Sequence, residues 1–193
     1  MNQLQTLLNQ KQNVDEYRIT EVTTTSSELF FIKDELQMNR GKDVTHINVT
    51  VYRNFEEQGT TFKGSSITQL SPTMSLDEME ALIDIAALAA SFVKNEYYTL
   101  QTPSSEIAPV IPSLFQEGSI VENVLHLVKD LYAEDHTFGA FINSSEFFIN
   151  KKDVRMVNSN GIDISYTTFF GEIEIITEAT GETESIELFD VLH

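Results

Sequence analysis

Residues 71–96 read SPTMSLDEMEALIDIAALAASFVKNE, and they carry the clearest start signal for a helix in this chain. Ser75 stands at the expected N-cap and Glu78 follows three residues later, which is the spacing of a capping box. Met74 and Met79 occupy the two positions of a hydrophobic staple. Apolar residues recur beyond the cap at three- and four-residue steps, so we expect about 20 helical residues spanning roughly 30 Å.

The centre of this helix is rich in alanine, which leaves little side-chain bulk. The alanines are Ala86, Ala87, Ala89 and Ala90. A sheet or a second helix can therefore approach closely, and we interpret the segment as a core helix that lies on a β-sheet. A membrane span is excluded, because Asp84 and the acidic first turn interrupt an apolar run that is already too short.

The composition is that of a strongly acidic chain with enough apolar residues to form a core. Hydrophobic residues make up 41% of the 193 residues, and 30 acidic against 12 basic residues give a formal net charge of -18. Binding to nucleic acid or to an anionic membrane needs clustered Lys and Arg, so this balance argues against both partners. It leaves room for a basic partner chain, although a solvated acidic surface without a partner is the simpler interpretation.

Cysteine is absent from the chain. Disulfides, thiol catalysis and Cys-based zinc sites are therefore excluded. The first residues, MNQLQTLLNQKQNVDEY, have neither a basic n-region nor a long apolar h-region, so we expect no signal peptide and a cytoplasmic location. The glycosylation patterns at Asn48 and Asn143 are interpreted as chance matches for the same reason.

Strand patterns before the main helix predict an antiparallel meander of about four strands, which follows a short helix over 3–12. The expected strands cover 17–25, 28–33 with a continuation over 35–40, 44–53 and 60–68. Turns are expected at 26–27, 41–43 and 54–59. Gly64 is expected to mark a bulge.

After the main helix, residues 97–115 contain three of the four prolines and predict an extended connection. Ser119 and Glu122 form a second capping box, which predicts an amphipathic helix to about residue 134. The expected strands that follow cover 137–142, 146–150, 152–157, 162–170, 172–178 and 183–189. The breaks between them are expected at 143–145, 158–161, Gly171 and 180–181.

The order of helix, meander, helix, helix and meander predicts an α+β fold, in which antiparallel β meanders pack with two main amphipathic helices. We expect one domain over 1–193 with sub-parts 1–96 and 97–193. In the last strands glutamates alternate with isoleucine and leucine. One face of this sheet is therefore expected to be acidic and the other apolar.

No residue pattern identifies a catalytic centre. Zinc hydrolysis needs closely spaced ligands, and the four histidines lie more than four residues apart: His46, His126, His136 and His193. Gly64-Ser65-Ser66 lacks the second glycine of a nucleophile elbow, and no phosphate-binding glycine motif occurs. The acidic strand residues Glu172, Glu174 and Glu178 are candidates for paired carboxylates or a Ca²⁺ site. A solvated strand face is the preferred interpretation of them.

Three stretches together resemble the TldD/PmbA family, also called modulators of DNA gyrase. The stretches are YRITEVTTTSSELFFIKDELQMNRGKDVTHINVTVYR, GSSITQLSPTMSLDEMEALIDIAALAASFVKNEYYTLQTP and SIVENVLHLVKDLY followed by VNSNGIDISY. They match that family's opening strands, its acid-capped Ala-rich helix with a Pro-containing linker, and its later helix and hairpin. The Asn-Ser-x-Gly turn of that hairpin corresponds to 158–161. The resemblance covers most of the chain.

The resemblance implies a metallopeptidase built from two parts, in which an HExxxH zinc helix lies in a separate C-terminal domain. Active assemblies of the family pair a zinc-bearing subunit with a partner that lacks the ligands, and they cut unfolded or leader-type peptides. This sequence corresponds to the N-terminal domain alone and has no HExxxH motif. No catalytic, cofactor-binding or metal-binding residue can therefore be transferred to it, and zinc is expected only in the separate domain. The gyrase label finds no support in an acidic chain.

From these observations we expect the chain to be a non-catalytic N-terminal domain, or a shortened homologue, of a TldD/PmbA-type metallopeptidase. It would contribute to dimer assembly and to the cavity that holds a peptide. A homo- or hetero-oligomer and an unfolded peptide are the expected partners, and whether the chain itself is an enzyme stays open. The alternative is a stand-alone binding or scaffold protein without a peptidase partner. A third hypothesis is an enzyme that uses Glu172 and Glu174.

Overall fold

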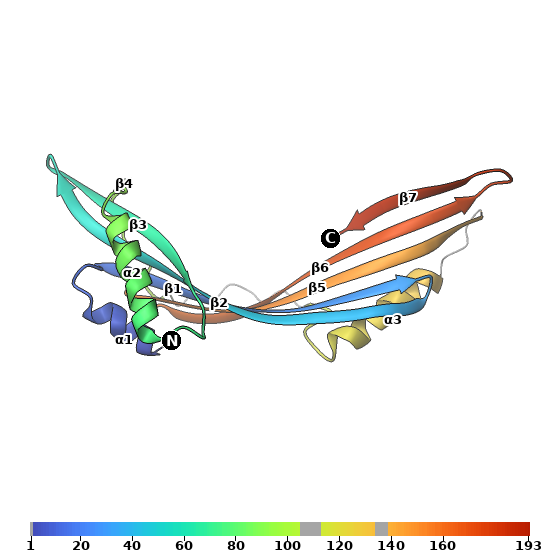
Figure 1. The fold of residues 1–193 in the computed structure, drawn as a ribbon, viewed down its shortest axis with the longest axis horizontal. Coiled ribbons are helices and arrows are strands. Elements are labelled where there is room, and N and C mark those ends of the chain that lie inside the picture. The colour runs from blue at the N-terminus through green and yellow to red at the C-terminus, as the bar shows by residue number, and fades with distance from the viewer. Residues whose placement is uncertain (1, 105–112, 134–138) are drawn as a thin grey trace. The chain divides into compact units, whose positions relative to one another are not determined.

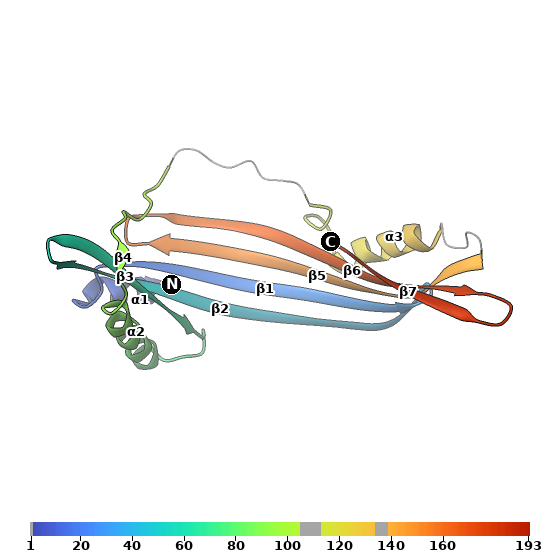
Figure 2. The same ribbon diagram turned by 90° about the horizontal axis from the view of Figure 1, so that it is seen from above.

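The computed structural model describes residues 2–104, 113–133 and 139–193. The helices are α1 (Asn2–Gln10), α2 (Leu76–Ala90) and α3 (Ile120–Ala133). The strands are β1 (Glu16–Ile32), β2 (Glu35–Glu57), β3 (Thr60–Leu70), β4 (Asn95–Glu96), β5 (Ala140–Asn158), β6 (Asp163–Thr180) and β7 (Ser185–Leu192). They form an antiparallel sheet in the order β4-β3-β2-β1-β5-β6-β7, and Figure 2 shows its central strands side by side. The expected α+β class is confirmed.

The contacts divide the chain into two units, and each unit takes residues from both predicted sub-parts, 1–96 and 97–193. Unit 1 comprises Met1–Thr23, Thr45–Ala108 and Asp153–Tyr166, whereas unit 2 comprises Thr24–Val44, Pro109–Lys152 and Thr167–His193. Strands β1, β2, β5 and β6 contribute residues to both. No helix within the described ranges is long and apolar enough to cross a membrane.

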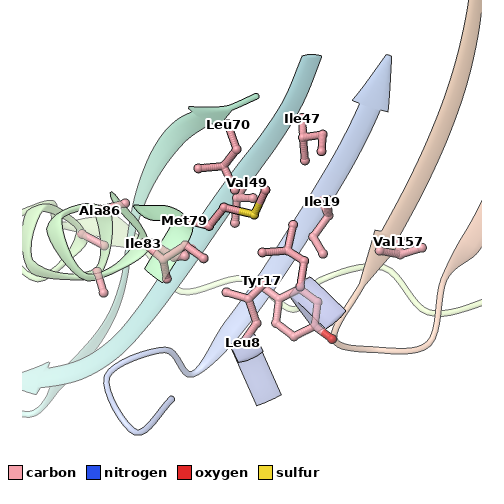
Figure 3. Packing of buried hydrophobic residues seen from close by; sticks show 14 residues of the cluster. Leu8, Tyr17, Ile19, Ile47, Val49, Leu70, Met79, Ile83, Ala86 and Val157 are labelled. Atoms are coloured by element: carbon pink, nitrogen blue, oxygen red, sulfur yellow. The ribbon is translucent and has the colours of Figure 1, made fainter. Parts of the chain in front are cut away.

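The core of unit 1 forms where α1 and α2 pack on the sheet (Figure 1). Leu8 of α1 and Ile83 of α2 are buried with Tyr17, Ile19 and Val49 of the sheet, as Figure 3 shows. Because side chains alternate along a strand, the residues between these positions on β1 and β2 lie on the opposite face. That opposite face carries the polar groups of unit 1.

Helix α2 begins as its sequence predicts and ends earlier. The Ser75 side chain accepts from the Glu78 N–H, and the Glu78 side chain accepts from the Ser75 N–H, which confirms the capping box. Met79 is buried and Met74 packs beside it, as expected for the staple. The helix has 15 residues and ends at Ala90, so the predicted extension to about 20 residues is wrong.

Gly64 explains why α2 and β3 approach so closely, and it does so without a bulge. The β2–β3 register is unbroken there, with Arg53 opposite Gly64 and Tyr52 opposite Ser65, so the predicted bulge is wrong. A Cβ atom at Gly64 would lie 1.8 Å from the carbonyl oxygen of Ala90. The glycine is therefore required for contact between the strand and the last turn of α2.

Several predicted breaks lie inside continuous strands. The expected turns at 26–27, 41–43 and 143–145 and the junction at Gly171 all fall within β1, β2, β5 and β6. Glycine at position 41 has a different physical role, since a Cβ there would lie 2.9 Å from the Ser26 carbonyl oxygen. The meander before α2 therefore consists of three long strands instead of the expected four.

The actual turns between these strands are short and use positive backbone angles. Lys33 has a φ of 54°, and Gln58 and Gly59 have φ values of 53° and 77°. Two successive residues with positive φ form the type I′ geometry that matches the twist of a hairpin. The predicted loop over 54–59 is thus a two-residue turn at its end.

Among the described residues, α3 covers the core of unit 2, and the prediction of that helix is confirmed. Val124 and Val128 of α3 are buried with Leu29, Phe31 and Phe147 of the sheet. The second capping box stays a prediction. Expectations for Pro109, Pro112, His136 and the strand start at 137 lie outside the described residues.

Candidate functional site

The histidines do not come together in the structure. His46 on β2 and His126 on α3 are both exposed. His193 lies 3.2 Å from a carboxylate oxygen of Glu172, measured from its Nδ1 atom. The described residues contain no group of three or more His, Cys, Asp or Glu side chains able to hold a metal ion. These residues therefore do not supply a ligand set for the zinc ion, which the TldD/PmbA resemblance places in a separate domain.

The three acidic candidates on β6 have separate partners. Glu172 faces His193, and Glu178 accepts a hydrogen bond of 2.6 Å from the Ser185 hydroxyl. Glu174 lies near Glu146, whose carboxyl pKa is raised by burial and further by the charges of Glu174 and Glu28. Residues two apart on a strand are about 6.5–7 Å apart, so Glu172 and Glu174 are neighbours on one face of β6, and Ile176 separates them from Glu178. The Gly64-Ser65-Ser66 stretch lies within β3, away from any strand-to-helix turn.

Unit 1 contains a cavity of about 530 Å³ on the sheet face opposite α2. Arg18 of β1, Thr50 and Tyr52 of β2, and Ser65 of β3 line its floor. The segment 98–101, which follows α2 and β4, lines the cavity as well. An adjoining cavity of about 720 Å³ shares some of this lining.

A fully buried lysine lies beside this cavity. The Lys63 ammonium pairs with the Glu16 carboxylate, and the Lys63 side chain has no exposed surface. Its Nζ atom lies 4.9 Å from the ring centre of Tyr97, 5.0 Å from that of Tyr98 and 5.8 Å from that of Tyr52. A desolvated cation over several rings gains both ionic and cation–π stabilisation. Lys63 thereby fixes the start of segment 97–101 on the sheet.

The turn at 158–161 fixes the other end of that segment. The Asn158 side-chain amide donates to the Gln101 carbonyl oxygen at 2.8 Å, and the Asn160 amide donates to the Leu100 carbonyl oxygen at 3.0 Å. The Asn158 side-chain oxygen also accepts from the N–H groups of Asn160 and Ile162. The predicted hairpin turn is confirmed, and it holds the cavity wall in addition to joining β5 and β6.

Arg18 is the charged residue in the lining of the 530 Å³ cavity. Burial raises the pKa of the Tyr52 phenol, and the positive charge of Arg18 partly opposes that rise. In the part of the chain that the structure describes, no carboxylate forms an ion pair with Arg18.

Unit 2 presents an exposed strand at the end of the sheet. β7 has one neighbour in the sheet order, β6, and all eight of its residues are exposed. Ile186, Leu188 and Phe189 are 68%, 60% and 56% exposed. The predicted division of this region into an acidic and an apolar face is incomplete, because Phe189 and Val191 face the same side as Glu187.

Sequence reasoning missed both the Lys63 cluster and Arg18. Glu16 and Lys63 are 47 residues apart, and Tyr97 and Tyr98 belong to a segment without helical or strand periodicity. The one local signal was the tyrosine pair at 97–98, which four residues separate from Pro103. An aromatic pair in a polar connection indicates a segment that packs on the domain.

The described residues thus define an α+β protein with a polar cavity on one sheet face and an exposed edge strand. The same fold occurs in three solved structures. TldE from Thermococcus kodakarensis has a TM-score of 0.65 at 15% identity, and the match covers 97% of this chain and 42% of that one. The resemblance to TldD/PmbA proteins is confirmed at the level of the fold.

Two further structures are candidate modulators of DNA gyrase. The protein from Thermotoga maritima has a TM-score of 0.60 at 13% identity, with 91% of this chain and 39% of that one covered. The protein from Bacteroides thetaiotaomicron has a TM-score of 0.61 at 13% identity, with 99% and 45% covered. This chain therefore spans less than half the length of these structures. No protein-family model matches the sequence, and no curated protein matches it.

Proposed function

We propose that this chain is the non-catalytic part of a TldD/PmbA-type metallopeptidase, acting in the cytoplasm to hold an unfolded peptide and to support dimer assembly. The fold of TldE over 97% of the chain supports the kinship. The described residues offer no metal-ligand group of three or more, so bond cleavage is assigned to a zinc-bearing domain or subunit elsewhere. The observation that carries the peptide-holding role is the exposed edge of β7.

An edge strand binds an extended peptide by adding it as a further strand. The backbone N–H and C=O groups on its free side supply the hydrogen bonds, and alternate side chains supply contacts. On β7 the exposed Ile186, Leu188 and Leu192 offer apolar contacts on one face. Phe189 and Val191 do the same on the other. Such a surface favours a peptide by its backbone and apolar content more than by a single side chain.

The register identifies which residues of β7 have free backbone groups. The Gly181 N–H donates to the Glu184 carbonyl at 2.8 Å, which makes this a hydrogen-bonded pair. Such pairs recur at every second position of an antiparallel ladder. Ile186 and Leu188 therefore bond to β6, whereas Glu187 and Phe189 direct their backbone groups away from it.

The test is a pair of proline variants in the full chain. Glu187→Pro removes an outward N–H, so we expect at least about tenfold weaker binding of an unfolded, labelled casein peptide by fluorescence anisotropy. Glu187→Gln is the charge-matched control and should bind as the unaltered chain does. Leu188→Pro removes a bond to β6 and should destabilise the strand itself. Equal binding by Glu187→Pro and Glu187→Gln would show that β7 does not add a peptide strand.

The exposed face of α2 supports the proposed dimer. Ile85 and Leu88 lie three residues apart on the helix and are 64% and 63% exposed. Neighbours at this spacing form one apolar patch that a second subunit can cover. We expect Leu88→Asp to reduce the sedimentation coefficient of an assembled sample. Gln3→Asp, at an exposed position on α1, tests whether added charge alone has that effect.

The second candidate is a stand-alone binding protein without a peptidase partner. The cavity of unit 1 and the exposed edge of β7 favour it, because each surface can bind a ligand without a catalytic domain. The coding sequence beyond codon 193 and in neighbouring frames distinguishes the two functions. An HExxxH helix encoded there supports the peptidase assembly, and its absence supports the binding protein.

A further inference from the structure

The arginines of this chain fall into two groups according to their partners. Arg40 contacts Glu28 and Glu146, Arg53 lies 3.5 Å from Asp15, and Arg155 lies 2.9 Å from Asp163. Arg18 is the remaining arginine of the sequence. Among the described residues it has no carboxylate partner.

Arg18 is an exposed residue, so its guanidinium is open to solvent and to a ligand, in a chain with 30 acidic and 12 basic residues. The nearest acidic residue on the same face of β1 is Glu16, and its carboxylate already has other partners. Lys63 pairs with its carboxylate, and the Asn54 side chain donates to the same oxygen at 3.4 Å. Arg18 therefore faces a cavity whose other lining residues are neutral.

The neutral lining defines the chemistry of a ligand. The hydroxyl groups of Thr50, Tyr52 and Ser65 can donate hydrogen bonds on the same side of the cavity as Arg18. Leu100, Met156 and Ile162 supply apolar surface for an aliphatic group. A guanidinium binds a planar carboxylate through two parallel hydrogen bonds.

The single positive charge favours a carboxylate over a phosphate. The lining contains no Lys, no His and no second Arg to balance a dianion. The volume of about 530 Å³ is within the range of sites for small ligands. It accommodates an amino acid or the last residues of a short peptide.

We propose that this cavity is a carboxylate-binding site, in which Arg18 pairs with the carboxylate of an aliphatic amino acid or with the C-terminus of a short peptide. The inference goes beyond the proposed function, because it concerns a different unit from β7 and requires no strand addition. A free amino acid and a peptide C-terminus share this chemistry, so the probes must distinguish them.

The test uses the full chain and two-dimensional ¹H–¹⁵N NMR titrations with four probes. They are N-acetyl-leucine, its amide, N-acetyl-Gly-Gly-Leu and the amide of that peptide. We expect saturable shifts at residues lining the cavity with both acids and at least about tenfold weaker binding of both amides, since loss of a charged hydrogen bond has that magnitude. The tighter of the two acids identifies the source of the carboxylate.

Variants then test the role of Arg18 directly. Arg18→Gln should weaken binding of the acids by about tenfold or more, and Arg18→Lys should weaken it less. Arg53→Gln removes the same charge from the opposite sheet face of the same unit, and it should bind the acids unchanged. The strand-blocking variant Glu187→Pro should also bind the acids unchanged. Failure of the proposed peptide binding by β7 is therefore distinguishable from failure of the proposed carboxylate site.

Three results would overturn the inference. They are equal binding of acids and amides, unchanged binding by Arg18→Gln while its spectrum shows a folded chain, and no saturation by either acid up to about 10 mM.

Discussion

In unit 1 the buried cation Lys63 meets the carboxylate of Glu16 and three tyrosine rings. In unit 2 the carboxylates of Glu28 and Glu146 share the cation of Arg40, and burial raises the pKa of Glu146. The first arrangement balances a desolvated charge, whereas the second leaves an excess of negative charge. Unit 1 therefore neutralises its buried cation, whereas unit 2 leaves a partly buried carboxylate with incomplete compensation.

The two units also differ in how closely neighbouring atoms approach a glycine of the sheet, as Gly64 and Gly171 show. A Cβ atom at Gly64 of unit 1 would lie 1.8 Å from the backbone oxygen of Ala90. A Cβ atom at Gly171 of unit 2 would lie 3.3 Å from the flexible end of the Ile149 side chain. Backbone cannot move away without displacing α2, but a side-chain methyl group can rotate. The first prediction follows from this difference.

We expect Gly64→Ala to destabilise the chain by at least about 4 kcal/mol, because α2 must move off the sheet. Gly171→Ala is the matched variant, and it should cost less than about 1 kcal/mol. Urea unfolding followed by circular dichroism measures both changes. Similar midpoints for the two variants would contradict the proposed difference in packing.

The second prediction concerns the buried ion pair of unit 1. Glu16→Gln leaves the Lys63 ammonium buried without a negative partner, so we expect a loss of about 3 kcal/mol. Lys63→Met removes the buried charge and keeps a side chain of similar length, so its cost should be smaller. Glu16 retains 15% exposure of its side chain and can be solvated in that variant. A larger loss for Lys63→Met than for Glu16→Gln would contradict this account.

The third and smallest prediction is that carboxylates in the two units respond to pH with opposite sign. The hydrogen bond from Lys11, followed by that from Asn13, lowers the pKa of Asp84 below 3.8. A group with a lowered pKa stabilises the fold above its unfolded value, and this contribution is lost as the pH falls through the folded value. Asp84→Asn should therefore remove stability at neutral pH, by under about 1 kcal/mol because the Asp84 side chain is 45% exposed.

For Glu146 we expect the opposite dependence of stability on pH. Its pKa is raised above 4.5, so its charged form opposes folding at neutral pH, and stability rises as the pH falls through the folded value towards 4.5. Glu146→Gln should raise the neutral-pH melting temperature by a few degrees at most. Glu182→Gln removes the same charge from the exposed turn before β7, and it controls for net charge. A stability curve of Glu146→Gln that parallels the unaltered chain between pH 4 and 7 would contradict the prediction.

The sequence predicts best those features that depend on neighbouring residues. The capping box at Ser75 and the turn at 158–161 were predictable, because cap and turn geometries need only a few adjacent side chains. Gly41 and Gly171 were misinterpreted as breaks, and Gly64 was misinterpreted as a bulge. In the structure, Gly41 and Gly64 lie where another chain segment approaches, and that segment is distant in sequence.

The cavity was not predictable for the same reason. Its lining combines β1, β2, β3, β5 and segment 98–101, and no short motif joins them. The lack of a partner for Arg18 is visible only after the three other arginines have been assigned to their carboxylates. Composition predicted an acidic chain but could not show which arginine lies at the cavity.

The placement of β5 beside β1 has a consequence for synthesis of the chain. Tyr17 and Ser159 exchange hydrogen bonds although they are 142 residues apart. A ribosome adds about 5–20 residues per second, so β1 waits roughly seven to thirty seconds for this partner. During that interval its backbone edge is open to other nascent chains, and aggregation on the ribosome competes with closure of the sheet.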